Sequence, residues 1–70
     1  MRNWINVERA KRNMTREDLA KALEVSPHVI ASIESEKYKA NVEFAIRLSR
    51  YFNKKVEDIF FLTEEDVPWN

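Results

Sequence analysis

Two signals for the start of a helix lie close together in the first half of the chain. Residues 15–18, Thr-Arg-Glu-Asp, resemble a capping box in which Asp replaces the usual Glu. Ser26 followed by Pro27 combines a strong N-cap residue with a proline suited to the first helical position. The apolar residues after the first signal predict a helix that ends near Glu24, with a buried stripe of Leu19, Ala20, Ala22 and Leu23. The chain therefore has to join two short helices through a linker of about three residues, 24–26.

The other helices are expected from apolar spacing. One should run from Asn3, as its N-cap, to about Arg12, with an apolar side that includes Trp4, Val7, Ala10 and, just beyond the end of the helix, Met14. The helix that opens at Ser26 should end around Ser35, with buried residues at Val29, Ile30 and Ile33. A longer helix, from about residue 41 or 42 to residue 52, is predicted by the helical recurrence of Phe44, Ala45, Leu48 and Phe52.

A short helix over residues 56–60 and an extended segment over residues 60–62 are expected to follow. No strand-like alternation precedes residue 59, and the chain contains no glycine, so the fold class is all-α. Seventy residues suffice for one domain, which we place at residues 1–62. Residues 63–70 then form an acidic C-terminal tail, which should be loose unless a partner orders it.

Composition excludes several classes of function. With no cysteine and one histidine, a structural zinc site is close to excluded, and no cofactor or small-molecule ligand is indicated. No apolar run is long enough to span a membrane or to serve as a secretory signal, so a cytoplasmic protein is expected. No set of nucleophile and base is visible, and without glycine there is no phosphate-cradling glycine loop. We therefore do not expect an enzyme.

Charge is unevenly distributed, although the net charge is zero. The residues after position 56 include five acids and no Lys or Arg, so residues 1–56 hold all 12 basic residues against seven of the 12 acids. A mildly basic body with an acidic tail is compatible with a surface that faces phosphates. The alternative is that ordinary solvated helix faces happen to carry their charges unevenly, without a phosphate-binding surface.

The two closely linked helices make a helix-turn-helix arrangement, in which the second helix lies in the DNA major groove. Further residues fit the same pattern: Leu23-Glu24-Val25-Ser26, Ile30, Ile33-Glu34, Lys37-Tyr38, Leu48-Ser49 and Val56-Glu57-Asp58-Ile59-Phe60. Over residues 3–62 the chain resembles the Cro/repressor-type (XRE) helix-turn-helix domain. The resemblance implies a five-helix, lambda-repressor-like fold with a short extended C-terminal segment.

The resemblance also implies roles for individual residues. Arg16, where the family usually has Gln, should point at a phosphate. The outward positions of the recognition helix are Pro27, His28, Ala31 and Ser32. His28 matches a position where Gln often reads adenine, and Ala31 is expected to contact thymine methyl groups. The loop residues expected to touch the DNA backbone are Lys37 and Lys39. Tyr38 would either reach a phosphate or cover the core beneath the loop, and we favour the second. For each residue, simple solvent exposure is the alternative.

The chain departs from the family's pattern at several positions. Glu24, Glu36 and Asn53 stand where the family usually has Gly, and Ala40 stands where it has Pro. The outward face of the recognition helix has no Arg, Lys, Asn or Gln, which are the side chains that read bases best. Glu34 is expected in the family as a structural residue, whereas Glu36 would repel phosphates.

Large apolar residues gather at both ends of the chain, and such residues exposed together mark an interface. The residues assigned to a dimer interface are Phe60, Phe61, Leu62 and Trp69. Trp4 and Val67 belong to the same group of large apolar residues at the chain ends. Residues 60–62 are expected to pair with their own copy as a ribbon or to pack as a helical patch. The alternative is that some of them close the core of the monomer.

The sequence thus predicts a DNA-binding transcriptional regulator, expected to be a repressor, which binds a palindromic operator in double-stranded DNA as a homodimer. The alternative is a protein-interaction module or an antitoxin-like helix-turn-helix protein with weak or no DNA binding.

Overall fold

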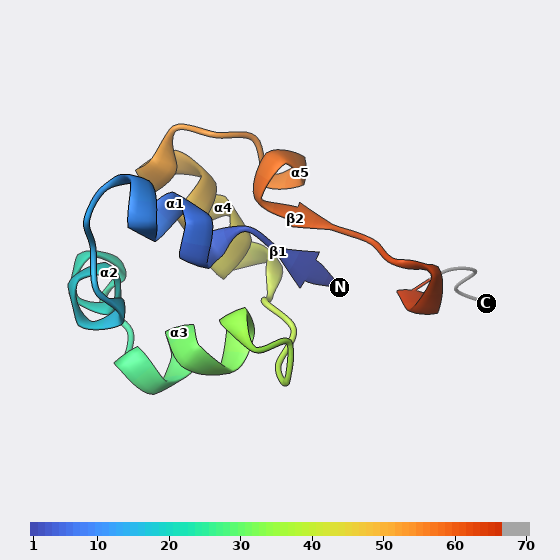
Figure 1. Cartoon of the computed structure of the whole chain (residues 1–70), viewed down its shortest axis with the longest axis horizontal. Helices are drawn as coiled ribbons and strands as arrows, with labels where there is room; N and C mark the ends of the chain where they lie inside the picture. Colours follow the sequence, from blue (N-terminus) through green and yellow to red (C-terminus); the bar gives the residue numbers. More distant parts are fainter. Residues whose placement is uncertain (67–70) are drawn as a thin grey trace.

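The computed structural model describes residues 1–66, which form five α-helices, one two-stranded sheet and a short 3-10 helix. In chain order the elements are β1 (Arg2–Asn3), α1 (Ile5–Lys11), α2 (Arg16–Leu23), α3 (Pro27–Glu34), α4 (Val42–Phe52), α5 (Val56–Ile59), β2 (Phe60–Phe61) and η1 (Glu64–Asp66). The helices surround one core, and both ends of the described chain lie on the same side of the molecule (Figure 1). The all-α, five-helix prediction is confirmed.

The helix starts read from the sequence are formed by local hydrogen bonds. Thr15 Oγ1 accepts from the backbone N–H of Asp18, and Asp18 Oδ2 accepts from the N–H of Thr15, each at 3.0 Å. At the start of α3, Ser26 Oγ accepts from the N–H of Val29, and Pro27 occupies the first turn. The side chain of Asn41 caps α4 in the same way. These caps satisfy N–H groups that a helix start leaves unpaired.

The interior contains one apolar cluster with contributions from all five helices and β2. Its buried members are Ile5, Leu19, Ala20, Leu23, Ile30, Ile33, Phe44, Leu48, Phe52, Ile59 and Phe60. The helices present these residues at spacings of three and four, which places them on one face of each helix. Within residues 1–66, no helix has the length and apolar character that crossing a membrane requires.

The predicted face of α1 is wrong. Ile5 and Glu8 are its buried residues, whereas Trp4 and Val7 are exposed. The helix begins at Ile5, with Trp4 rather than the predicted Asn3 as its N-cap, and the N–H of Trp4 donates to Ile59 O at 2.8 Å. Glu8 is tolerated in the interior because Arg12 Nη1 lies 2.8 Å from its Oε1, and this hydrogen bond lowers the pKa of Glu8 below its ordinary value.

The ends of the chain are joined by contacts that the sequence analysis did not predict. β1 and β2 pair antiparallel, with Arg2 opposite Phe61 and Asn3 opposite Phe60. Residues 60–62 were expected to be extended, and residues 60–61 are, but their partner is the N-terminal strand of the same chain. Residues 63–66 are also ordered: Asp66 accepts from the Thr63 N–H and from the N-terminal ammonium of Met1. The expectation of a loose tail is therefore wrong for this part.

Within residues 1–66, four residues adopt the left-handed backbone conformation, and none of them is glycine. Glu24, Glu36 and Asn53, with φ of 58°, 66° and 56°, stand at the three positions where the resemblance leads one to expect glycine, and Asn13 is the fourth. The turns therefore keep their shape without glycine. The two glutamates carry the steric cost of a Cβ in this region.

Candidate nucleic-acid interface

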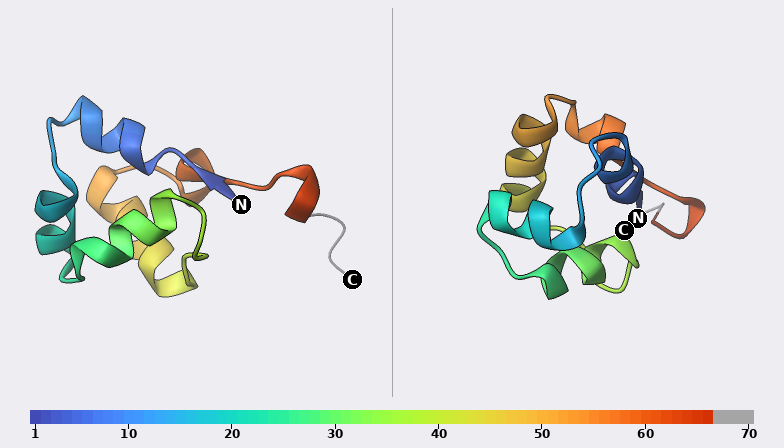
Figure 2. Two further views of the ribbon diagram at one scale, coloured as in Figure 1. Left: turned by 60° about the horizontal axis from the view of Figure 1, so that its bottom comes forward. Right: turned by 60° about the vertical axis from the view of Figure 1, so that its left-hand side comes forward.

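The outer side of α3 is the best candidate for a binding face. Among the described elements, none covers this side, and α3 lies in front of the other helices in the left view of Figure 2. Its inner face is buried through Ile30 and Ile33. Helical spacing then directs the opposite face to solvent, where Pro27 and His28 are exposed and Ala31 and Ser32 are partly exposed. The structure thus brings the four predicted recognition-helix residues onto one accessible face.

A shallow hollow, here called the Arg16 hollow, lies along one side of this face. Its lining residues are Arg16, His28, Ala31, Ser32, Ser35 and Lys37. The hollow joins the start of α2 to the outer side of α3 and the loop that follows it. Five of the seven predicted DNA-binding residues therefore meet in one place, whereas Pro27 and Lys39 do not line the hollow.

Arg16 is held in place by Glu34. Its Nε lies 3.1 Å from Glu34 Oε1, and its side chain is 50% exposed. Glu34 also receives two hydrogen bonds from Arg9, at 2.6 and 3.1 Å, and its own side chain is only 4% exposed. Glu34 raises the pKa of the Arg9 guanidinium above its ordinary value. One buried carboxylate therefore connects α1, α2 and α3 and fixes the guanidinium of Arg16 at the edge of the hollow.

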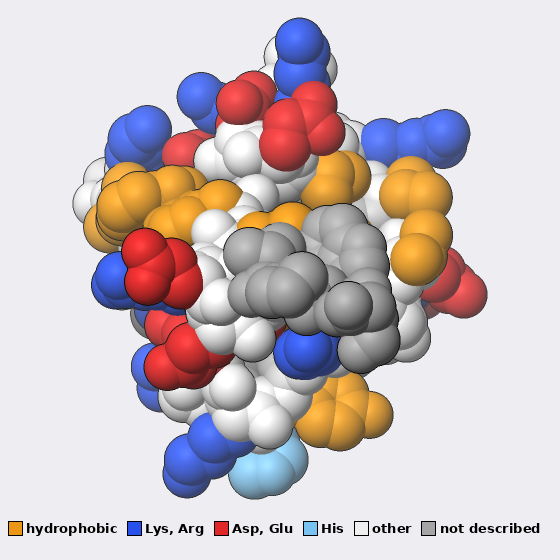
Figure 3. Space-filling view, turned by 90° about the vertical axis from the view of Figure 1, so that its right-hand side faces the viewer, with side chains coloured by type: hydrophobic (Ala, Val, Ile, Leu, Met, Phe, Trp, Pro, Cys, Tyr) orange, Lys and Arg blue, Asp and Glu red, His pale blue; other side chains and the backbone are white. Residues whose placement is uncertain are grey.

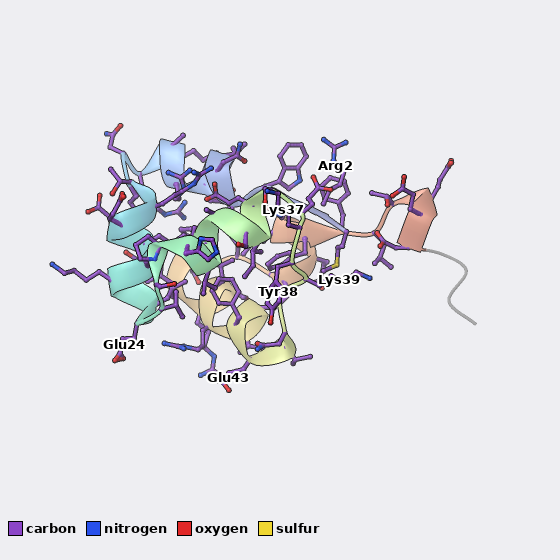
Figure 4. All side chains as sticks on the ribbon, turned by 90° about the horizontal axis from the view of Figure 1, so that it is seen from below. Arg2, Glu24, Lys37, Tyr38, Lys39 and Glu43 are labelled. Atoms are coloured by element: carbon purple, nitrogen blue, oxygen red, sulfur yellow. The ribbon has the colours of Figure 1, made fainter. Side chains whose placement is uncertain are left out.

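Tyr38 lies on the surface and does not cover the core. Its side chain is among the exposed large apolar groups, at 65%. The reason is the turn after α3: Glu36 is left-handed, and the N–H groups of Lys37 and Tyr38 both donate to Ser32 O, at 3.1 and 3.3 Å. These bonds hold the loop beside the end of α3. Figure 4 looks onto this side and labels Lys37 and Tyr38 to either side of the helix end. The favoured prediction for Tyr38 is wrong.

A second shallow hollow, here called the Tyr38 hollow, lies on the other side of His28 and Ser32. Its lining residues are His28, Val29, Ser32 and Tyr38. His28 and Ser32 line both hollows and separate them. The sequence analysis missed this site because Val29 was taken as a buried residue, whereas it is partly exposed.

Two ion pairs contain residues of the loop after α3. Lys39 Nζ lies 3.9 Å from Asp66 Oδ1, and the Lys39 side chain is 78% exposed. Arg2 Nε lies 3.8 Å from Glu36 Oε2. The Arg2–Glu36 pair is exposed on both sides and contributes little to stability. Lys39 therefore sits toward the paired chain ends rather than beside the recognition face.

An apolar surface surrounds the paired chain ends. The rings of Trp4 and Phe61 stack with centroids 5.4 Å apart, and the guanidinium of Arg2 lies over the ring of Phe61. Trp4 is 48% exposed and Leu62 is 49% exposed. Phe60, in contrast, is 6% exposed and belongs to the core. Figure 3 looks at this end of the molecule and shows several hydrophobic patches on it. Trp69, the fourth residue assigned to an interface, lies outside the described residues.

Comparison with known proteins decides the family. The helix-turn-helix family profile matches residues 7–59, from within α1 to the end of α5. The chain belongs to the XRE-type helix-turn-helix family. The chain is 43% identical over 67 residues to an uncharacterized HTH-type transcriptional regulator of Archaeoglobus fulgidus, covering 96% of this chain and 94% of the relative.

Two further relatives extend this helix-turn-helix family comparison. An uncharacterized HTH-type transcriptional regulator of Methanocaldococcus jannaschii is 39% identical over 66 residues, covering 94% of this chain and all of the relative. One of Bacillus subtilis is 30% identical over 66 residues, with the same coverage of both chains. The family match begins after β1 and ends before β2, so the paired chain ends lie outside the matched residues. The helix-turn-helix domain therefore holds both hollows, while the apolar surface is built largely by residues that flank it.

Proposed function

We propose that this helix-turn-helix protein is a transcriptional repressor that binds a palindromic DNA operator as a homodimer. The observation that supports it most is the exposed face of α3 beside the Arg16 hollow, whose lining includes two cations, Arg16 and Lys37. A helix with small outward side chains can enter the major groove closely. Cations beside it can then reach the phosphates that border the groove.

The proposed contacts follow from position on this face. His28 and Ser32 offer hydrogen-bonding groups to base edges, and Ala31 offers a methyl group to thymine. Pro27 packs at the entry of α3 into the groove. Arg16 and Lys37 bind phosphates that border the groove, whereas the predicted phosphate contact of Lys39, which lies toward the paired chain ends, stays a prediction from the sequence. Because the face has few strong readers, part of the specificity would come from DNA shape.

The apolar surface at the chain ends is the proposed dimer interface. The C-terminal end of α3 and the β1–β2 pair lie toward the same end of the molecule (Figures 1 and 2). A two-fold axis beside this end would cover Phe61 and Leu62, together with Trp4. The two α3 helices would then face DNA about 34–36 Å apart, which is one helical turn. Phe60 is buried in its own chain and would support the proposed interface from the core without contacting the partner. The assignment of Trp69 to the interface stays a prediction from the sequence.

Selection of binding sites from random duplex DNA, repeated at two salt concentrations, tests the function. The expected result is an enriched palindrome with half-sites about one turn apart and binding that weakens steeply with salt. Arg16→Gln should weaken binding to every sequence, whereas His28→Ala should change preference between sequences. Arg50→Gln, an exposed arginine on α4, is the matched control. Enrichment of nothing at either salt concentration would favour the protein-interaction module instead.

Sedimentation tests the homodimer separately. Phe61→Asp places a charge beside Trp4 on the proposed interface and should yield monomers. Val42→Asp is the control, because Val42 is more exposed, at 76%, but lies on α4. A dimer that survives Phe61→Asp would move the interface to another surface without affecting the DNA-binding proposal.

A further inference from the structure

The two hollows beside α3 differ in charge. The Arg16 hollow contains two permanently charged residues, Arg16 and Lys37. The Tyr38 hollow contains no Lys, Arg, Asp or Glu, and its walls are a valine, an aromatic ring, a serine and a histidine. A site for a phosphate gains affinity from cations, whereas a site without them suits an uncharged group. The two sides of the recognition face are therefore suited to different parts of DNA.

We infer that the Tyr38 hollow takes the C5-methyl group of a thymine, so that Tyr38 and Val29 determine specificity at one base pair in each half-site. Thymine is the base that presents an apolar group in the major groove. The hollow lies directly beside His28 and Ser32, on the face proposed to enter that groove. This inference rests on the proposed DNA-binding function and adds a base preference that neither His28 nor Ser32 supplies.

The backbone holds Tyr38 at this place. Its N–H donates to Ser32 O at 3.3 Å, and the neighbouring Lys37 N–H donates to the same oxygen at 3.1 Å. Ser32 lines the hollow, so the loop is tied to the wall that Tyr38 faces. An aromatic side chain loses little conformational freedom when it packs, because it has two rotatable bonds. The backbone of Tyr38 is thus held beside α3, while 65% of the residue's surface stays exposed for contact.

Replacement of thymine by deoxyuridine tests the inference, because it removes the methyl group and nothing else. Fluorescence anisotropy would be measured on the selected operator with each thymine replaced in turn. For the unmodified protein, replacement of the thymine seated in the Tyr38 hollow should weaken binding about fourfold, the effect expected of one buried methyl group, and its dependence on Tyr38 distinguishes it from a thymine that contacts Ala31. Tyr38→Phe should keep this preference because it keeps the ring. Tyr38→Ala should bind the thymine and deoxyuridine operators equally. Tyr51→Ala, an exposed tyrosine that packs on Phe52 outside the hollow, should keep the preference.

Each other outcome has a definite meaning. If Tyr38→Ala and Tyr38→Phe both weaken binding to all sequences alike, the hydroxyl binds a phosphate and the inference is wrong. If no thymine responds to replacement, or if Tyr38→Ala keeps the response, the hollow is not the methyl site. In each of these cases the protein still binds its operator, so the proposed function stands. The inference and the proposed function would both be wrong only if the unmodified protein bound no DNA at all.

Discussion

The helix-turn-helix and the paired chain ends are held together by contacts of different range. α2 and α3 each begin with a side-chain cap formed between residues three positions apart. The chain ends are held by β1 with β2 and by Met1 with Asp66, a separation of 65 positions. The first region presents the hollows, and the second presents the apolar surface. The surface proposed to read DNA thus rests on locally capped helices that Glu34 joins, and the surface proposed for dimerisation depends on closure of the whole chain.

This difference has an energetic consequence. A cap forms with little loss of chain entropy, because its partners are already neighbours. Joining the two ends requires ordering the chain between them, and the cost grows with the length of the loop. The ends therefore need burial of large side chains to stay paired, which Phe60 and Ile59 provide. Substitutions in the two regions should separate these contributions.

The largest expected effect is at Phe60. Phe60→Ala removes a nearly buried ring from the core beside β1 and should lower the free energy of unfolding by about 4 kcal/mol. Its neighbour Phe61 is only partly buried, so Phe61→Ala should cost about 1 kcal/mol in the same urea titration followed by circular dichroism. Equal costs at the two positions would mean that β2 does not have one inner and one outer face.

Sequence patterns predicted the locally determined elements and missed those that depend on distant partners. The capping box at Thr15 and the Ser26-Pro27 start each lie within one turn of helix, so α2 and α3 were predicted nearly to the residue. β1 has two residues and gives no pattern, and only its pairing with β2 defines it as a strand. The face of α1 was missed because Glu8 reads as a surface residue until Arg12 is placed beside it.

The second effect concerns the connection between the helix-turn-helix and α1. Glu34→Gln removes the charge that binds Arg9 and Arg16 and leaves the largely buried Arg9 without its anion. We expect a loss of about 3 kcal/mol in the free energy of unfolding, since an unpaired buried charge is costly. Glu43→Gln, an exposed carboxylate on α4, is the control and should stay within about 0.5 kcal/mol. A small effect at Glu34 would mean that local caps suffice to hold α2 and α3 in place.

The candidate site was only partly predictable for the same reason. The resemblance to the family, together with helical spacing, identified the outward residues of α3, including His28 and Ser32. It gave no sign that Glu34 would hold Arg16, because the two residues are 18 positions apart. The place of Tyr38 depends on the left-handed turn at Glu36, and a glutamate there carries no turn signal of its own.

A smaller, stabilising effect is expected at the turn between α2 and α3. Glu24→Gly relieves the steric cost of a left-handed residue with a Cβ and should raise the free energy of unfolding by about 0.5–1 kcal/mol, after the greater entropy of glycine in the unfolded chain is counted. Lys21→Gly, in the same helix but with helical backbone, should lower it by about 1 kcal/mol. Opposite signs for the same replacement would show that backbone conformation decides the outcome; destabilisation at both positions would exclude this account of the turn.

The smallest effect is expected at the chain ends and depends on pH. Hydrogen bonds from the Thr63 N–H and the Met1 ammonium lower the pKa of Asp66 to about 2. Because this pKa lies below its value in the unfolded chain, the ionised form favours folding above pH 4, and the contribution is lost as the pH falls through about 2. The melting temperature of Asp66→Asn should therefore lie below that of the unmodified protein at pH 5, and the difference should shrink between pH 4 and pH 2.

Glu65→Gln, at an exposed neighbouring position, is the control and should show no such convergence of melting temperatures. If the difference in melting temperature between Asp66→Asn and the unmodified protein stays the same from pH 5 to pH 2, the contacts of Asp66 add nothing to the pairing of the chain ends. The ends would then be held by β1, β2 and the core beneath them.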